Sequence, residues 1–214
     1  MANCASCKGK PCRRGVSEGR PADCPGKEVS PEEVLSLYSE EGRRAAKVSA
    51  KVEAEGYAVA TRVEEIMDYA YKMGYHKIGL AFCAGLSEEA AIFTEILASN
   101  GFAVESVCCK NCSVSKSYIG IEREEYAHPE NEFEPMCNPV GQAKVLDDAG
   151  CDLAVLLGLC VGHDTLFLKH LKAPCTVLGV KDRAMGNNPM GAIYTARGYM
   201  KRQYHFLRDK YGEA

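Results

Sequence analysis

The sequence predicts an α/β protein in which helices cover both faces of a parallel sheet. From residue 75 onward, short runs rich in Val, Ile and Leu alternate with stretches of helical periodicity. The apolar runs are nearly continuous, which is typical of strands buried on both faces. At 214 residues the chain is long enough for one such domain and a smaller module. We therefore expect a three-layer, Rossmann-like domain with about four parallel strands.

Residues 1–30 differ from the rest of the chain. They are rich in Gly and Pro, carry basic residues around their cysteines and show no helical or strand period. Such a segment buries little apolar surface, so something other than a core must order it. We expect a cysteine-rich, metal-binding segment over 1–30 and an α/β domain over 31–214, in which 31–73 is a helical lead-in and 75–214 forms the sheet and its crossover helices.

Two helices are expected in the lead-in. The first spans 30–56, with Ser30 as its N-cap and Pro31 in its first turn. The second spans 61–74, has apolar residues at helical spacing and ends at Gly74. Both apolar stripes are expected to face a core.

Four strands follow, separated by helices. The strands are expected at 77–83, 103–109, 151–160 and 175–182. Helices are expected between them, capped by Ser87 and Asn138, and a long helix over 187–212 closes the chain. An irregular charged excursion, 110–136, follows the second strand.

Charge and hydropathy exclude several classes of partner. A net charge of −3 and a pI near 6.0 argue against binding nucleic acid by phosphate neutralisation. No apolar run approaches the roughly 20 residues of a membrane helix. The polar N-terminus lacks the apolar segment of a secretory signal. We expect a cytoplasmic protein without nucleic-acid or membrane partners, and the sequence does not predict its oligomeric state.

The chain contains 12 cysteines. Disulfides belong to oxidising compartments, so in the cytosol clustered cysteines indicate metal or cluster ligation, or thiol chemistry. For any single cysteine, a role as a small buried apolar residue is the alternative. The positions of the cysteines in the chain distinguish metal ligation or thiol chemistry from a role as buried apolar residues.

Most cysteines of the α/β region map to one edge of the expected sheet. Carboxyl ends of parallel strands meet at one edge, and ligands of open α/β sheets bind there. The expected edge site consists of Cys83, Cys108, Cys109, Cys137 and Cys160. Cys112 lies three residues beyond the second strand and its role stays open, whereas Cys151 and Cys175 begin strands and are expected to be structural.

Thiolates that converge from separate elements suit a tetrahedral zinc or an iron–sulfur cluster. We favour a cluster bound by three of Cys83, Cys109, Cys137 and Cys160, with the fourth sulfur or His163 facing a small-molecule substrate. The catalytic candidates are Cys137, whose thiol precedes a helix N-terminus, His163 as a ligand or acid–base group, and Asp164 as its orienting partner or a helix cap. Lys181 and Arg183 lie at the end of the fourth strand and would favour an anionic ligand or offset the charge of a thiolate cluster.

The N-terminal cysteines have the spacing Cys-x2-Cys-x4-Cys-x11-Cys. A Cys-x2-Cys pair chelates readily, because a tight turn directs both sulfurs at one point. Metal binding would supply the order that this segment otherwise lacks. The spacing matches neither ferredoxins nor a complete zinc ribbon, so zinc and an iron–sulfur cluster both remain open. The expected ligands are Cys4, Cys7, Cys12 and Cys24.

The order of motifs resembles a known family. The stretches "CASCKGKPC", "GLAFCAGL", "SVCCK", "MCNPVGQA" and "GLCVGHDTLF" occur in that order. They resemble an uncharacterised prokaryotic family labelled as metal-binding and defined as a domain of unknown function. The resemblance covers nearly the whole chain. It implies metal binding at the two cysteine sets above, with His163 and Asp164 beside the second, and it implies no reaction.

Three functions remain open from the sequence, and whether the protein is an enzyme is not predicted. The first is a cluster-dependent enzyme whose architecture resembles that of cluster-dependent desulfidases. The expected partner is a small-molecule substrate or an electron donor. The second is a zinc or soft-metal binding or sensing protein without turnover. The third is a thiol redox protein using the adjacent Cys108–Cys109 pair.

Overall fold

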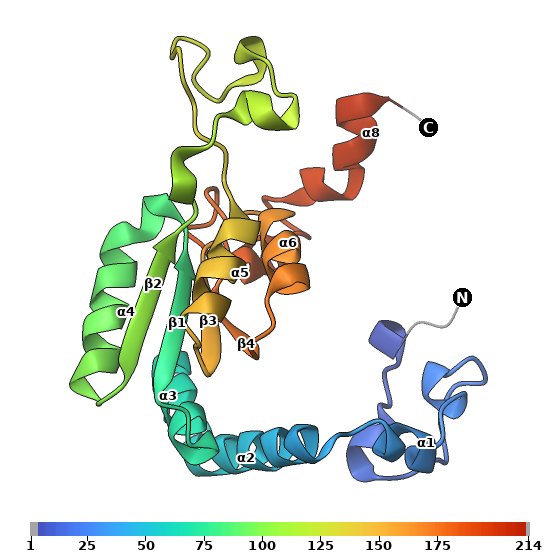
Figure 1. Ribbon diagram of the computed structural model, residues 1–214. Helices are drawn as coiled ribbons and strands as arrows, with labels where there is room; N and C mark the ends of the chain where they lie inside the picture. The colour runs from blue at the N-terminus through green and yellow to red at the C-terminus, as the bar shows by residue number, and fades with distance from the viewer. Residues whose placement is uncertain (1–3, 213–214) are drawn as a thin grey trace. The chain divides into compact units, whose positions relative to one another are not determined.

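The computed structural model describes residues 4–212 and contains a four-stranded sheet in the order β2-β1-β3-β4 (Figure 1). Every strand pairing in the sheet is parallel. The strands are β1 (Lys77–Phe82), β2 (Ala103–Cys108), β3 (Leu153–Leu157) and β4 (Cys175–Gly179). The structure therefore confirms the predicted α/β fold class with a parallel sheet.

Helices connect and flank these strands. The α-helices are α1 (Pro31–Ser36), α2 (Glu40–Gly56), α3 (Arg62–Met73), α4 (Ser87–Ser99), α5 (Pro139–Asp148), α6 (His163–His170), α7 (Pro189–Tyr194) and α8 (Phe206–Tyr211). Short 3-10 helices are η1 (Cys4–Ser6), η2 (Pro11–Arg14), η3 (Pro25–Lys27), η4 (Ala84–Leu86), η5 (Asn111–Ser113), η6 (Lys116–Ile119), η7 (Arg123–Glu125) and η8 (Lys201–His205). The chain divides into two compact units between Lys51 and Val52.

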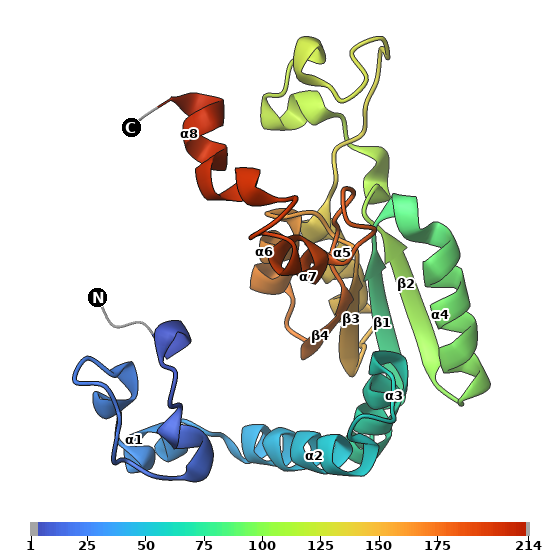
Figure 2. The same cartoon turned by 180° about the vertical axis from the view of Figure 1, so that it is seen from behind.

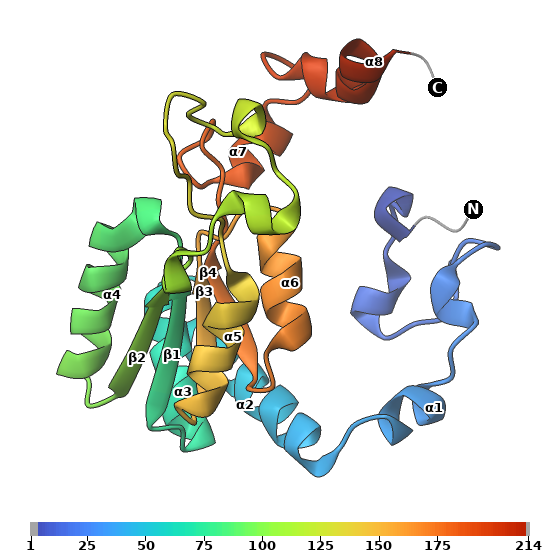
Figure 3. The same ribbon diagram turned by 45° about the horizontal axis from the view of Figure 1, so that its top comes forward.

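Successive strand residues point to opposite faces, which gives the sheet two separate cores. One face carries Ile78 and Leu80 and packs against α3 and α4 (Figure 2). The other face carries Ala81 and Cys83 and packs against α5 and α6 (Figure 3). The same two-residue alternation that buries Ile78 and Leu80 under α4 therefore directs Cys83 to the α5 face.

The strand order places a topological switch point at the carboxyl edge of the sheet. The chain runs from β1 through α4 to β2, and then through α5 to β3 on the other side of β1. Open α/β sheets bind ligands where the direction of strand addition reverses, which here is between β1 and β3. Cys83 follows β1 and Cys160 follows β3, so both lie at this point of the topology.

Local capping signals set several helix starts. The Ser30 side chain accepts a hydrogen bond from the Glu33 N–H at 3.0 Å, and Asn138 accepts one from the Gly141 N–H at 2.9 Å. Ser87 does not cap α4; it is the first residue of that helix, and its hydroxyl donates to the Ala84 carbonyl oxygen at 2.5 Å. The reason is that η4 already turns the chain before α4 begins.

Two predicted long helices are interrupted. The expected helix over 30–56 breaks between α1 and α2, where Leu37 is 79% exposed and gains nothing from helical packing. The expected helix over 187–212 is divided into α7, η8 and α8 by a stretch that contains Gly198. The two predictions of one continuous helix were wrong for the same reason, because helical propensity without a buried face does not sustain a long helix.

Among residues 4–212, none of the helices has both the length and the apolar character that a membrane span requires.

Gly158 directly follows β3 and has no room for a side chain. Its φ is +69°, and a Cβ would lie 2.1 Å from Leu86 Cδ1. Gly150 has a similar φ of +66° but open space around it. We expect Gly158→Ala to lower the free energy of unfolding by about 2–4 kcal/mol and Gly150→Ala by about 1 kcal/mol, measured by urea denaturation. Equal losses in the two variants would contradict the proposed contact with Leu86.

Candidate functional site

Cys83 and Cys109 extend two neighbouring strands by one residue each. The Cys83 N–H donates to the Leu157 carbonyl oxygen at 3.1 Å, and the Cys109 N–H donates to the Phe82 carbonyl oxygen at 2.8 Å. Since Phe82 pairs with Cys108 in the register, Cys83 and Cys109 are opposite each other on the face covered by α5. Their side chains are buried, with 8% and 2% of their surface exposed.

Cys137 reaches the same place through the charged excursion 110–136, which extends beyond the end of β2 (Figure 1). Backbone hydrogen bonds close the base of this loop, from Lys116 to Glu134 at 3.1 Å and from Met136 to Val114 at 2.8 Å. The Asn138 N–H then donates to the Cys109 carbonyl oxygen at 2.7 Å. A loop of 27 residues therefore returns Cys137 to the end of β2.

Two asparagines hold the start of α5 against the end of β2. The Asn111 amide donates to the Cys108 carbonyl oxygen at 3.0 Å and to the Asn138 carbonyl oxygen at 2.9 Å. The Asn138 amide donates in turn to Asn111 Oδ1 at 3.2 Å. A Cβ at Gly141 would lie 2.2 Å from Asn111 Oδ1, so only glycine lets the helix approach this closely.

The sulfurs of Cys109 and Cys137 are in contact, 3.9 Å apart. The Cys109 sulfur also accepts a hydrogen bond from the Ala84 N–H at 3.3 Å. The hydrogen bond from Cys109, together with the positive charge of Lys110 and of His163, lowers the pKa of Cys137 to about 5, against the opposing effect of burial. The pKa of Cys109 is raised, first by its hydrogen bond with Cys137 and then by burial. The two pKa values shift in opposite directions, so the proton that the pair shares stays on Cys109 when Cys137 ionises.

Cys160 comes after β3, which pairs with β1 on the side away from β2, so Cys83 lies between Cys109 and Cys160 in the strand order. The Arg183 guanidinium donates to the Cys160 sulfur at 3.5 Å, and this contact raises the pKa of Arg183, with further contributions from the charges of Cys83 and Cys137. Lys181 also belongs to this region, since its Nζ lies 3.8 Å from the position of a Cβ on Gly85. The structure thus places two cations from the β4–α7 connection beside the cysteines.

His163 and Asp164 begin α6, but they do not bond to each other through the predicted orienting contact. Asp164 Oδ1 accepts the N–H groups of Gly162 and Thr165 at 3.0 and 2.8 Å, and so stabilises the turn into the helix. His163 Nδ1 is buried without a hydrogen-bond partner. Its imidazole acts electrostatically on Cys137, as described above.

In the structure, the edge site consists of Cys83, Cys109, Cys137 and Cys160 with His163 and Arg183, so it differs from the expected set by the loss of Cys108 and the gain of the two side chains beside the cysteines. Cys108 has a different environment, because its sulfur accepts the Lys110 N–H at 3.4 Å. Cys112 is exposed, with a left-handed φ of 64°. Cys151 and Cys175 lie at the amino ends of β3 and β4, at the opposite edge of the sheet from Cys83.

Two residues of this region escaped the sequence analysis. Lys110 donates through Nζ to the Pro135 carbonyl oxygen at 2.6 Å and stabilises charge on Cys137. Gln142 is fully buried, and its Nε2 donates to the carbonyl oxygens of Phe82 and Val107 at 3.1 and 2.8 Å, joining the ends of β1 and β2. The sequence holds one signal for each residue: Lys110 directly follows the Cys108–Cys109 pair, and Gln142 is a lone polar residue among small residues in the first turns of α5.

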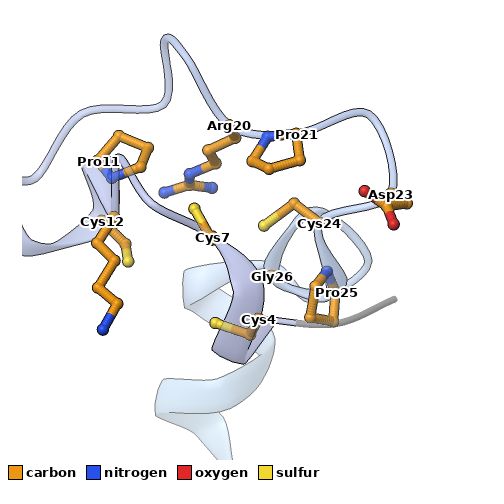
Figure 4. Close-up of a pocket in the computed structure, with 11 residues that line it drawn as sticks. Cys4, Cys7, Pro11, Cys12, Arg20, Pro21, Asp23, Cys24, Pro25 and Gly26 are labelled. Atoms are coloured by element: carbon orange, nitrogen blue, oxygen red, sulfur yellow. The ribbon is translucent and has the colours of Figure 1, made fainter. Parts of the chain in front are cut away.

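The N-terminal unit contains a cavity of about 150 Å³ lined by cysteines. Figure 4 shows the side chains of Cys4, Cys7, Cys12 and Cys24 around it. Turns shape three of these positions, since the carbonyl oxygens of Cys4, Cys12 and Cys24 each accept an N–H three residues on, at 3.1–3.2 Å. The four predicted N-terminal ligands therefore line one space.

Positive charge accompanies these cysteines. Arg20 and Lys10 line the same cavity, and Arg20 Nε is buried without a hydrogen-bond partner. Such charge suits a site that gathers thiolates. Among residues 4–212, no three His, Cys, Asp or Glu side chains are already positioned to hold a metal ion.

Comparison with known proteins gives a family and a close relative. Residues 24–178 match the family model described as "Protein of unknown function (DUF1847)". The chain is 43% identical over 199 residues to "Uncharacterized protein MJ0455" of Methanocaldococcus jannaschii, which covers 93% of this chain and 96% of the relative. No solved structure matches.

The low pKa of Cys137 has a measurable consequence. We expect the rate of Cys137 alkylation by iodoacetamide in the metal-free protein to follow a thiolate titration with a midpoint near pH 5, because the thiolate is the reacting form. Cys109→Ala removes the largest stabilising contact and should move the midpoint upward. Peptide mapping by mass spectrometry assigns the alkylated residue at each pH. A midpoint that does not move in Cys109→Ala would contradict the shared proton.

Proposed function

Because the chain belongs to the DUF1847 family of proteins of unknown function, its activity must be inferred from its sites, and we propose that it is a metal-binding protein with a second, cysteine-based reaction site. The metal is held by the N-terminal cysteines. The edge site carries out sulfur or redox chemistry on a small molecule. The observation that supports metal binding is the convergence of Cys4, Cys7, Cys12 and Cys24 on one cavity.

The N-terminal residues fit a soft metal ion or cluster. Thiolates prefer zinc and iron–sulfur clusters over hard cations such as magnesium and calcium. The segment is short of buried apolar side chains, since Pro11 is its one buried residue between positions 4 and 30. Metal ligation supplies the free energy that a core of this size does not. Arg20 and Lys10 offset the charge that four thiolates bring.

A second candidate concerns the edge site, where an iron–sulfur cluster held by three of Cys83, Cys109, Cys137 and Cys160 is the alternative to free thiols. The observation that favours it is the contact of Arg183 with Cys160 and its electrostatic coupling to Cys83 and Cys137. Such a cluster, when bound, supplies electron transfer or an open iron for a sulfur ligand. His163 at the start of α6 would then face the substrate.

The N-terminal site is tested by ligand removal. We expect the anaerobically purified protein to contain metal, and Cys4→Ser/Cys7→Ser to lose it. Residues 4–30 should then become sensitive to limited proteolysis, because the ordering ligands are gone. Thermal unfolding of the sheet should change little. Metal analysis, absorption spectroscopy and proteolysis followed by mass spectrometry provide the readouts.

Cys112→Ser is the matched control, since Cys112 is exposed and outside both cysteine sets. It should retain the metal and the protected segment. A colourless zinc protein and a brown iron–sulfur protein would both support metal binding and would identify the metal. Unchanged metal content in Cys4→Ser/Cys7→Ser would show that these cysteines are not the ligands.

A further inference from the structure

We propose that Cys137 and Cys109 form a dithiol that reduces small anionic disulfides, with Cys137 as the attacking thiol and Cys109 as the resolving thiol. The inference rests on the edge-site chemistry proposed above and is independent of the N-terminal metal. It replaces the adjacent pair Cys108–Cys109, which the sequence suggested, with a pair from two different elements.

Distance is the first argument. The two sulfurs are 3.9 Å apart, and a disulfide requires about 2.05 Å, so closure needs a shift of about 1.9 Å. The two residues are held together through the backbone, because the Asn138 N–H donates to the Cys109 carbonyl oxygen at 2.7 Å. The Cys108 sulfur has a local contact with the Lys110 N–H at 3.4 Å, whereas the Cys109 sulfur contacts the Cys137 sulfur of another element. An adjacent-residue disulfide would also close a strained ring.

Access is the second argument, and it assigns the two roles. Cys109 is 2% exposed, whereas Cys137 is only partly buried, at the end of the loop that leads into α5. A substrate disulfide therefore meets Cys137 first. The Ala84 N–H, at the start of η4, donates to the Cys109 sulfur, so the resolving thiol is held in place while it contacts Cys137.

The charged side chains around the edge site indicate the class of substrate. Arg183 is exposed and lies against Cys160, while Lys181 reaches Gly85 beside Cys83. Lys110 adds positive charge next to Cys137. Exposed cations around a reacting sulfur favour carboxylate-bearing ligands over cationic ones. The structure thus points to a small disulfide with negatively charged ends.

The exchange balances in two steps. The Cys137 thiolate attacks one sulfur of R–S–S–R′, the substrate S–S bond breaks, and R′–S⁻ leaves and takes a proton from solvent. The Cys109 thiol then gives up its proton and attacks the Cys137 sulfur, which releases R–S⁻ to take that proton. The substrate gains two electrons and becomes two thiols, while the pair loses two and becomes a disulfide. A dithiol reductant restores the pair by the same exchange in reverse.

The experiment uses the full chain, reduced and purified anaerobically, with two probes of opposite charge. Dithiodipropionate is dianionic and cystamine is dicationic. We expect dithiodipropionate to oxidise the protein to a form in which peptide mapping finds Cys109 linked to Cys137. Cys137→Ser should abolish this disulfide and slow the consumption of dithiodipropionate by about 100-fold or more, because the attacking thiolate is lost. Cys109→Ser should accumulate a mixed disulfide on Cys137, seen as the added mass of half the probe.

Two further variants sharpen the assignment. Cys112→Ser should behave as the unmodified protein, since Cys112 takes no part in the exchange. Arg183→Ala should slow oxidation by dithiodipropionate about fivefold more than oxidation by cystamine, which separates a binding charge from a structural effect. A disulfide linking other cysteines, or a mixed disulfide formed equally well in Cys137→Ser, would overturn the proposal.

Metal analysis of the same samples separates this proposal from the others. If edge-site cysteines hold a cluster, the protein will contain iron that is lost in Cys137→Ser, and the dithiol assignment is wrong. If Cys4→Ser/Cys7→Ser contains as much metal as the unmodified chain, the N-terminal proposal fails while the exchange at Cys137 is unaffected. The two failures are therefore distinguishable.

Discussion

The hydrogen bond between the Asn138 N–H and the Cys109 carbonyl oxygen is the constraint on which the edge site depends. It connects the end of β2 to the start of α5 and so closes the excursion that separates the two elements in sequence. The cost of closing a loop grows only slowly with its length, so a few well-placed backbone contacts are enough. Side-chain hydrogen bonds between Asn111 and Asn138, and the close approach that Gly141 permits, hold the same junction together.

The junction between the end of β2 and the start of α5 also has an electrostatic consequence. The junction brings the Cys137 sulfur into contact with the Cys109 sulfur and close to the cationic side chain of Lys110 and the imidazole of His163. Burial alone would disfavour a charged sulfur, as it does at Cys175, whose thiol has its pKa raised to about 11 by burial. The contrast between Cys175 and Cys137 shows that the surroundings of a cysteine in the fold determine whether its pKa is raised or lowered.

The two cysteine sets rely on different sources of order. The edge site is held by strands and helices that bury apolar side chains on both faces of the sheet, and Gln142 ties the strand ends together beneath it. The N-terminal set has turns and a cavity but few buried side chains. A preorganised scaffold suits a reaction site, whereas a segment without a core suits a ligand that contributes folding free energy.

The sequence by itself determined the sheet, its parallel strands and the edge to which the cysteines belong, because buried parallel strands leave a continuous apolar signature and end at one edge. It also determined local caps such as Ser30 and Asn138, whose hydrogen bonds span three residues. Only the tertiary structure decided that Cys109 contacts Cys137 rather than Cys108, and that Lys110 and Gln142 serve the site. These contacts depend on strand register and on the closure of a long loop, and periodicity in one sequence does not encode which side chains such a closure brings together.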